Sequence, residues 1–142
     1  MKLVQHLLDT KGSEVISIAR DASVFDAIRI MAERSVGSLL VMDQEQIVGI
    51  VTERDYARKV ILLGRSSETT TVAQVMTTEV ITATAEQTIK ECMTLMTEKR
   101  IRHLPVVAGE KVVGLISIGD LVQAIISDQQ QEIEQLENYI SG

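Results

Sequence analysis

Two short segments combine residue types that could hold a phosphorylated sugar. Each contains a glycine, two apolar residues, a hydroxyl residue, two variable residues and an aspartate. They are residues 49–55 and 114–120. The apolar residues predict the end of a strand, and the start of a helix follows, where free backbone N–H groups and the helix dipole favour an anion. The hydroxyl of Thr52 or Ser117 can donate to a phosphate oxygen, and the carboxylate of Asp55 or Asp120 can accept from ribose hydroxyls.

The same spacing also has a purely structural interpretation. A hydroxyl residue followed three positions later by an acidic residue is a capping box, which would only start the next helix. For a single copy this interpretation would be preferred. Two copies at matching positions favour a ligand-binding role, and capping and binding are compatible.

The two segments belong to an internal repeat. Residues 15–61 align with residues 80–126 at a constant offset of 65, without a gap and with eleven identical positions. Both copies predict the order β-α-β-β-α. Since one unit of this size cannot bury its own sheet and helices, we expect an α/β fold in which two repeats pack around a pseudo-two-fold axis.

The pattern within each repeat predicts the elements that position the two segments. Opening runs lie at 15–18 and 80–83, first helices start near Ser23 and Thr88, and second helices cover 54–63 and 119–126. Hairpin strands are expected at 38–42 with 47–51, and at 104–107 with 112–116. A short leading helix should precede each repeat. We expect three regions, 1–66, 67–128 and an amphipathic helix at 129–142 that packs on the body or on a partner subunit.

This architecture resembles a tandem pair of cystathionine β-synthase-type (CBS) domains, also called a Bateman module. The resemblance covers roughly residues 1–126 and rests on the two repeats and their paired glycine-to-aspartate segments. It implies clefts between the repeats that bind an adenine nucleotide, with AMP favoured and ATP, NAD(H) or S-adenosylmethionine as alternatives. It also implies a regulatory module that forms a disc-like homodimer and signals to a separate effector protein.

The resemblance also assigns roles to the basic run that precedes the second hairpin. Arg102 and His103 would contact phosphate and Ile101 would pack on adenine, although Arg102 could instead pair with Glu98 or with the acidic tail. The candidate ligand-binding residues are Gly37, Ser38, Thr52, Arg54, Asp55, Thr82, Ile101, Arg102, His103, Ser117, Gly119 and Asp120. The first repeat has no basic residue at the positions of Arg102 and His103, so its cation would be Arg54, alone or together with Arg58. We therefore expect the cleft with Ser117, Asp120 and Arg102 to bind anions more tightly.

Composition excludes several other classes of protein. The net charge of −6 and the 2% aromatic content disfavour a nucleic-acid partner. No apolar run is long enough for a membrane span. The single cysteine, Cys92, indicates a reducing setting and a cytoplasmic protein, with a removed organelle-targeting segment as the alternative. The two histidines have no nearby ligand set, so no metal site is expected.

Three functions compete on the sequence alone. A nucleotide sensor is favoured by the repeat and its paired segments. A structural or protein-interaction module with degenerate clefts is favoured by the acidic, apolar-striped tail and by the missing base at Ser38. An enzyme ranks third, because no Ser-His-Asp set, acid/base pair or metal cluster is apparent.

Overall fold

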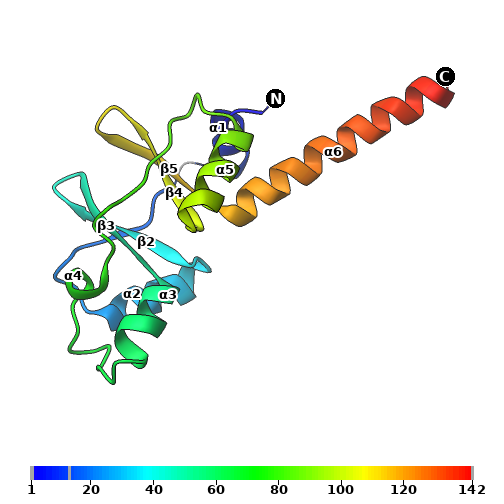
Figure 1. The fold of residues 1–142 in the computed structure, drawn as a ribbon. Coiled ribbons are helices and arrows are strands. Elements are labelled where there is room, and N and C mark those ends of the chain that lie inside the picture. The colour runs from blue at the N-terminus through cyan, green and yellow to red at the C-terminus, as the bar shows by residue number, and fades with distance from the viewer. Residues whose placement is uncertain (1, 13, 142) are drawn as a thin grey trace.

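The computed structural model describes residues 2–12 and 14–141 (Figure 1). Its helices are α1 (Val4–Lys11), α2 (Val24–Arg34), α3 (Glu53–Tyr56), α4 (Val72–Val75), α5 (Ile89–Lys99) and α6 (Ile118–Ser141). Its strands are β1 (Ser17–Ile18), β2 (Ser38–Asp43), β3 (Gln46–Thr52), β4 (His103–Ala108) and β5 (Lys111–Ser117). A π-helical turn, Ala57–Ile61, continues α3. The expected α/β class with two repeats is confirmed.

Each repeat is built around an antiparallel hairpin. In the first, β2 pairs with β3 through a two-residue turn in which Gln44 and Glu45 both have positive φ. In the second, β4 pairs with β5 and the turn has Gly109 at φ 64°. Turns of this kind match the right-handed twist of the flanking strands. Both predicted hairpins are therefore present, and each ends at the hydroxyl residue of its segment.

The predicted helix starts are formed by side-chain caps. Ser23 accepts a hydrogen bond from the backbone N–H of Asp26 at the start of α2. Thr88 and Glu91 form a reciprocal capping box at the start of α5. Each cap satisfies backbone donors that a helix terminus leaves without a partner. These caps fix the residue at which each first helix begins.

The leading helices are exchanged between the repeats. Val72 and Val75 of α4 are fully buried in the core that contains β2, β3 and α2 of the first repeat. Val4, Leu7 and Leu8 of α1 are buried in the core that contains β4, β5 and α5 of the second repeat. Figure 1 shows α1 beside α5, and α4 beside the first repeat. Each repeat therefore completes its core with a helix that precedes the other repeat in sequence.

The second repeat lacks a regular opening strand. In the first repeat, Leu40 donates its backbone N–H to the carbonyl of Ile16, which holds β1 parallel to β2. The matching position is Pro105, which has no N–H to donate. Only a bridge between Ala83 and Val106 remains. The expectation of a strand at residues 80–83 is therefore wrong, for a reason that the position of Pro105 explains.

The C-terminal helix also differs from the expectation. The second helix of repeat two and the tail form one continuous helix, α6, which projects away from the body (Figure 1). Residues 129–141 are exposed along its whole outer length, with Leu136 62% and Ile140 82% accessible. The tail does not pack on the body, because no break allows the helix to turn back. Its apolar stripe remains open to solvent.

Candidate functional site

A cleft of about 320 Å³ lies between the two repeats. Its lining is Gly37, Ile50, Thr52, Glu53, Arg54, Asp55, Thr77, Glu79, Val80, Ile81, Arg100, Ile101, Arg102 and His103. The volume falls within the range of about 300–1,000 Å³ that is usual for small-molecule sites. Repeat one supplies the end of β3 and the start of α3, and repeat two supplies the residues just before β4. The cleft therefore requires both repeats.

Three arginines give the cleft its basic side. Among the residues that the structure describes, Arg54, Arg100 and Arg102 form no ion pair. Arg100 ends α5 in the left-handed conformation, with φ 55°. The same cleft carries the carboxylates of Glu53 and Glu79. A ligand that combines an anion with hydroxyl or amino donors would match this mixed lining.

Thr52 and Asp55 form a capping box at the edge of the cleft. The backbone N–H of Asp55 donates to Thr52 Oγ1 at 3.1 Å, and Asp55 Oδ2 accepts from the backbone N–H of Thr52 at 3.0 Å. Lys59 lies one turn later on the helix, with its Nζ 3.2 Å from Asp55 Oδ1. The capping box predicted for this segment is therefore present. Asp55 nevertheless lines the cleft, so the cap also fixes a carboxylate beside it.

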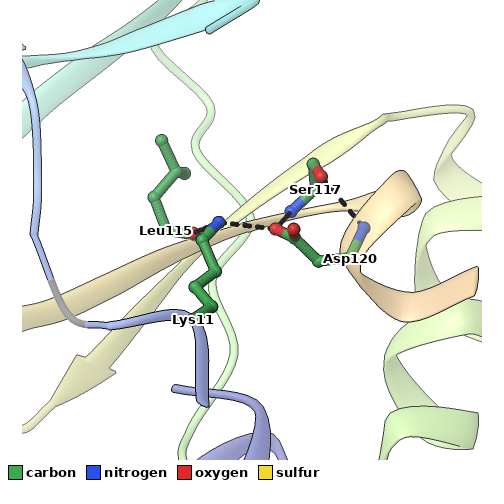
Figure 2. A network of polar contacts seen from close by, with 4 residues as sticks. All are labelled: Lys11, Leu115, Ser117 and Asp120. Atoms are coloured by element: carbon green, nitrogen blue, oxygen red, sulfur yellow. Dashed lines mark hydrogen bonds and ion pairs between the residues drawn. The ribbon is translucent and has the colours of Figure 1, made fainter. Parts of the chain in front are cut away.

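Ser117 and Asp120 make the equivalent contacts in the second repeat (Figure 2). Asp120 Oδ2 accepts from the backbone N–H of Ser117 at 2.8 Å, and the N–H of Asp120 donates to Ser117 Oγ at 3.1 Å. A further cation is present, because Lys11 Nζ lies 2.5 Å from Asp120 Oδ2. Burial alone would raise the pKa of Asp120, but the hydrogen bonds from Lys11 and Ser117 together lower it below its ordinary value. Asp120 therefore remains ionised.

The structure combines the candidate residues differently from the sequence expectation. Seven of them line the cleft, namely Gly37, Thr52, Arg54, Asp55, Ile101, Arg102 and His103. The others, Ser38, Thr82, Ser117, Gly119 and Asp120, are not part of its lining. The expected grouping of Arg102 with Ser117 and Asp120 is wrong for this cleft. The cleft is formed between the repeats. The basic residues at the start of β4 in repeat two therefore line the same cleft as the Thr52–Asp55 segment of repeat one.

His103 lies where the cleft approaches the second segment. It is the first residue of β4 and pairs in register with Ser117, and a Cβ atom on Gly37 would lie 3.7 Å from its ring. Burial lowers its pKa most, and the charges of Lys11, Arg102 and Arg54 lower it further, although Asp120 opposes them. The imidazole is therefore neutral near pH 7. A neutral ring can donate one hydrogen bond and accept another.

Sequence reasoning missed several residues of the cleft. Arg100 stands beside Arg102 in the basic run, and its exposed position at a helix end could have marked it. Ile50 and Glu53 belong to the first segment but were not assigned to the ligand, and Thr77, Glu79, Val80 and Ile81 carry no motif of their own. Thr77 reaches the cleft because it forms a backbone bridge with Ile50, with hydrogen bonds of 2.9 and 3.0 Å. Only the packing of α4 on the first repeat places that segment there.

The remaining candidates have structural roles. Cys92 is fully buried in the second core, and burial followed by the nearby charge of Glu91 raises the pKa of its thiol. His6 accepts a hydrogen bond from the backbone N–H of Leu3 and caps α1. Across the described residues, no group of three metal-ligating side chains occurs, and no helix is long and apolar enough to cross a membrane.

Comparison with known proteins identifies the family. The sequence profile of the CBS domain matches residues 9–61 and 72–127. The chain belongs to the CBS-domain family. A CBS domain-containing mitochondrial protein of Arabidopsis thaliana, CBSX3, is 43% identical over 127 residues, and this CBS pair spans 62% of its length.

Solved structures agree with the fold. A CBS-domain protein from Burkholderia ambifaria is 50% identical, with a TM-score of 0.87 over 90% of this chain and 96% of that one. The CBS domain pair of protein MJ0100 is 25% identical, with a TM-score of 0.81 over 90% and 98% of the two chains. That pair was crystallised with 5′-methylthioadenosine and S-adenosylmethionine. The resemblance deduced from the repeat is thereby confirmed.

Proposed function

We propose that this CBS pair is a non-catalytic sensor of adenine nucleotides, with AMP as its best-fitting ligand. The observation that carries the proposal is the lining of the cleft, which combines Arg54, Arg100 and Arg102 with apolar side chains and with Asp55. The complex of the MJ0100 pair with two adenosine derivatives supports an adenosine ligand here. The arginines favour a phosphate over the cationic sulfonium of S-adenosylmethionine.

The lining suggests how the nucleotide would be held. Adenine would pack between Ile101 and the wall of Ile50, Val80 and Ile81, which are all partly buried. Asp55 would accept the ribose hydroxyls, since its carboxylate is already fixed by the capping box. The phosphate would then face the guanidinium groups, with Arg102 offering a bidentate fork.

Titration calorimetry tests the proposal directly. Purified protein would be titrated with AMP, ATP, NAD(H) and S-adenosylmethionine, and AMP should bind most tightly. A charge-assisted hydrogen bond contributes about 1.5–3 kcal/mol, so Arg102→Ala should weaken AMP binding by roughly tenfold to hundredfold. Arg58→Ala is the matched control, because Arg58 is exposed on the π-helical turn and does not line the cleft. Silence with all four ligands would reject the sensor function.

The signal would pass to other protein chains. We infer that a homodimer and a separate effector use the exposed apolar surface, because Ile133, Leu136 and Ile140 form an uncovered stripe on α6. This stripe also supports the second candidate function, a protein-interaction module without a ligand. Deleting residues 129–142 should abolish association in either case. Only the sensor function also predicts that Arg102→Ala weakens the binding of AMP.

The single buried cysteine supports a reducing compartment. We propose the cytoplasm as the site of action, with the interior of an organelle as the alternative, since the similar Arabidopsis protein is named mitochondrial.

A further inference from the structure

The two aspartates have different cationic partners, although their segments are equivalent. Asp55 is paired with Lys59, which lies four residues later on the same helical segment. The position that matches Lys59 in the second repeat is Ala124. The charge beside Asp120 comes instead from Lys11, more than 100 residues away at the end of α1. The cation beside the second segment is therefore supplied by α1, the leading helix that packs on the second repeat.

Lys11 also replaces a backbone contact. In the first repeat, the chain beyond α4 forms a bridge in which Thr77 donates its N–H to the carbonyl of Ile50. The matching carbonyl in the second repeat belongs to Leu115, and it accepts from Lys11 Nζ at 2.7 Å (Figure 2). α1 has eight residues and α4 has four. Since α1 continues as a helix, the ammonium group of Lys11 takes the place of a bridging strand residue.

The ammonium group occupies the position that a ligand would need. By analogy with Asp55, the carboxylate of Asp120 would accept the hydroxyls of a ribose. Its Oδ2 already accepts from Lys11 and from the backbone N–H of Ser117. By the match between the repeats, the counterpart of His103 is Ser38, the first residue of β2, which is buried and brings no charge. Asp55 is paired with a lysine as well, but the ammonium group of Lys59 donates to the carbonyl of Val75 and leaves the strand carbonyl of Ile50 to Thr77. The ammonium group of Lys11 instead takes the strand carbonyl of Leu115, so a sugar at Asp120 would have to compete with it.

We propose that Lys11 is a built-in occupant of the second cleft, which holds Asp120 and excludes a nucleoside until the lysine is displaced. The proposal rests on the proposed function, because it concerns nucleoside binding at Asp120, the counterpart of the cleft at Asp55. It makes the protein asymmetric, with one open cleft at Asp55 and one closed by its own side chain. Lys11 is about one-third accessible, so it can leave without unfolding α1.

The position of His103 links the two clefts. It lines the open cleft, and its pKa responds to both Lys11 and Asp120. A ligand that displaced Lys11 would shift the positive charge that now acts on His103, a residue of the open cleft. Occupation of the second cleft would in this way change anion binding in the first.

The experiment counts binding sites by calorimetry in the full chain. Lys11→Met keeps the apolar stem and removes the charge, and Lys11→Gln serves as a second variant that can still donate to the Leu115 carbonyl. Lys2→Met is the matched control, because Lys2 also pairs with an aspartate of α6, Asp128, at 3.2 Å. The probes are AMP and adenosine, since the second cleft lacks the arginines of the first.

The wild-type protein and the Lys2→Met variant should bind one equivalent of AMP. Both Lys11 variants should gain a second binding site, and they should bind adenosine at least tenfold more tightly than the wild type. Adding Asp120→Asn to a Lys11 variant should remove that second site again. Two sites in the wild type, or no added site in both Lys11 variants, would overturn the proposal. Binding only in the Lys11 variants would support it while rejecting the function proposed for the open cleft. Absence of binding in every variant would reject both.

Discussion

The glycines of the two segments offer a direct test of how the halves fit together. A Cβ atom on Gly114 would lie 2.5 Å from Leu8 Cδ2 and 3.3 Å from Leu8 Cδ1. Leu8 is 5% accessible in the second core, so it has little room to move. Overfilling a packed core usually costs about 1–3 kcal/mol, and we expect Gly114→Ala to lower the free energy of unfolding by that amount. For a chain of this length, the loss corresponds to a fall in Tm of roughly 2–10 °C.

Gly119→Ala is the matched control. A Cβ atom there would meet only Ser117 Oγ, at an ordinary 3.6 Å, and the residue lies in α6. Alanine favours a helix over glycine by about 0.5–1 kcal/mol, so this variant should be unchanged or slightly stabilised. The two substitutions are chemically identical and lie five residues apart, and the structure predicts effects of opposite sign.

Urea unfolding followed by circular dichroism would measure both variants. A double-mutant cycle with Leu8→Ala identifies the cause. Leu8→Ala alone should lower the free energy of unfolding by about 2–5 kcal/mol. In the Gly114→Ala background the same substitution should lower it by less, because removing the leucine also removes the clash. If Gly114→Ala were as stable as the wild type, or if the two effects were simply additive, the close approach of α1 to β5 would be refuted.

Three further outcomes follow from the site and the core. The pKa of His103 is lowered by burial and by nearby cations, and a bound phosphate should raise it, so AMP affinity should increase as pH falls from 8 to 6. Calorimetry in buffers of different ionisation enthalpy would detect the accompanying proton uptake, and His103→Gln should reduce it to the part that comes from the phosphate of AMP, which titrates at about pH 6. The lowered pKa also means that the unfolded state binds the proton more readily, so His103→Gln should reduce the loss of stability on acidification below pH ~6.5. Because Cys92 is fully buried and burial also raises the pKa of its thiol, a thiol reagent at pH 7 should label it only when the core opens, and labelling as fast as that of an exposed thiol would contradict its core position.

Much of the fold was predictable because it depends on local patterns. The capping residues Ser23 and Thr88, the two hairpins and the repeat itself follow from sequence spacing. The missing strand before Pro105 could have been foreseen from the absent N–H. The projection of α6 does not follow from the sequence, because its apolar stripe predicts a helix that packs against a surface. In the structure the helix is continuous and carries that stripe away from the body.

The candidate site was predicted in its residue types but not in its grouping. Arg102 and Asp55 are 47 positions apart, and nothing in their spacing tells which repeat supplies which wall. The answer depends on the way the repeats face each other, which brings the end of β3 opposite the start of β4. Lys11 was missed for a similar reason. It lies on a leading helix outside the aligned repeat, and only the exchange of α1 brings it to Asp120.

That exchange has a consequence for the origin and engineering of the chain. A single repeat with its own leading helix would leave its core open and would have to borrow a helix from a second copy, which is domain swapping. The protein can therefore be understood as a swapped dimer whose two halves have been joined by the segment at residues 65–71. Each fragment cut in that segment carries the leading helix that fits the core of the other fragment. Mixed fragments should therefore rebuild both cores, so the chain offers a natural design for a two-piece complementation system.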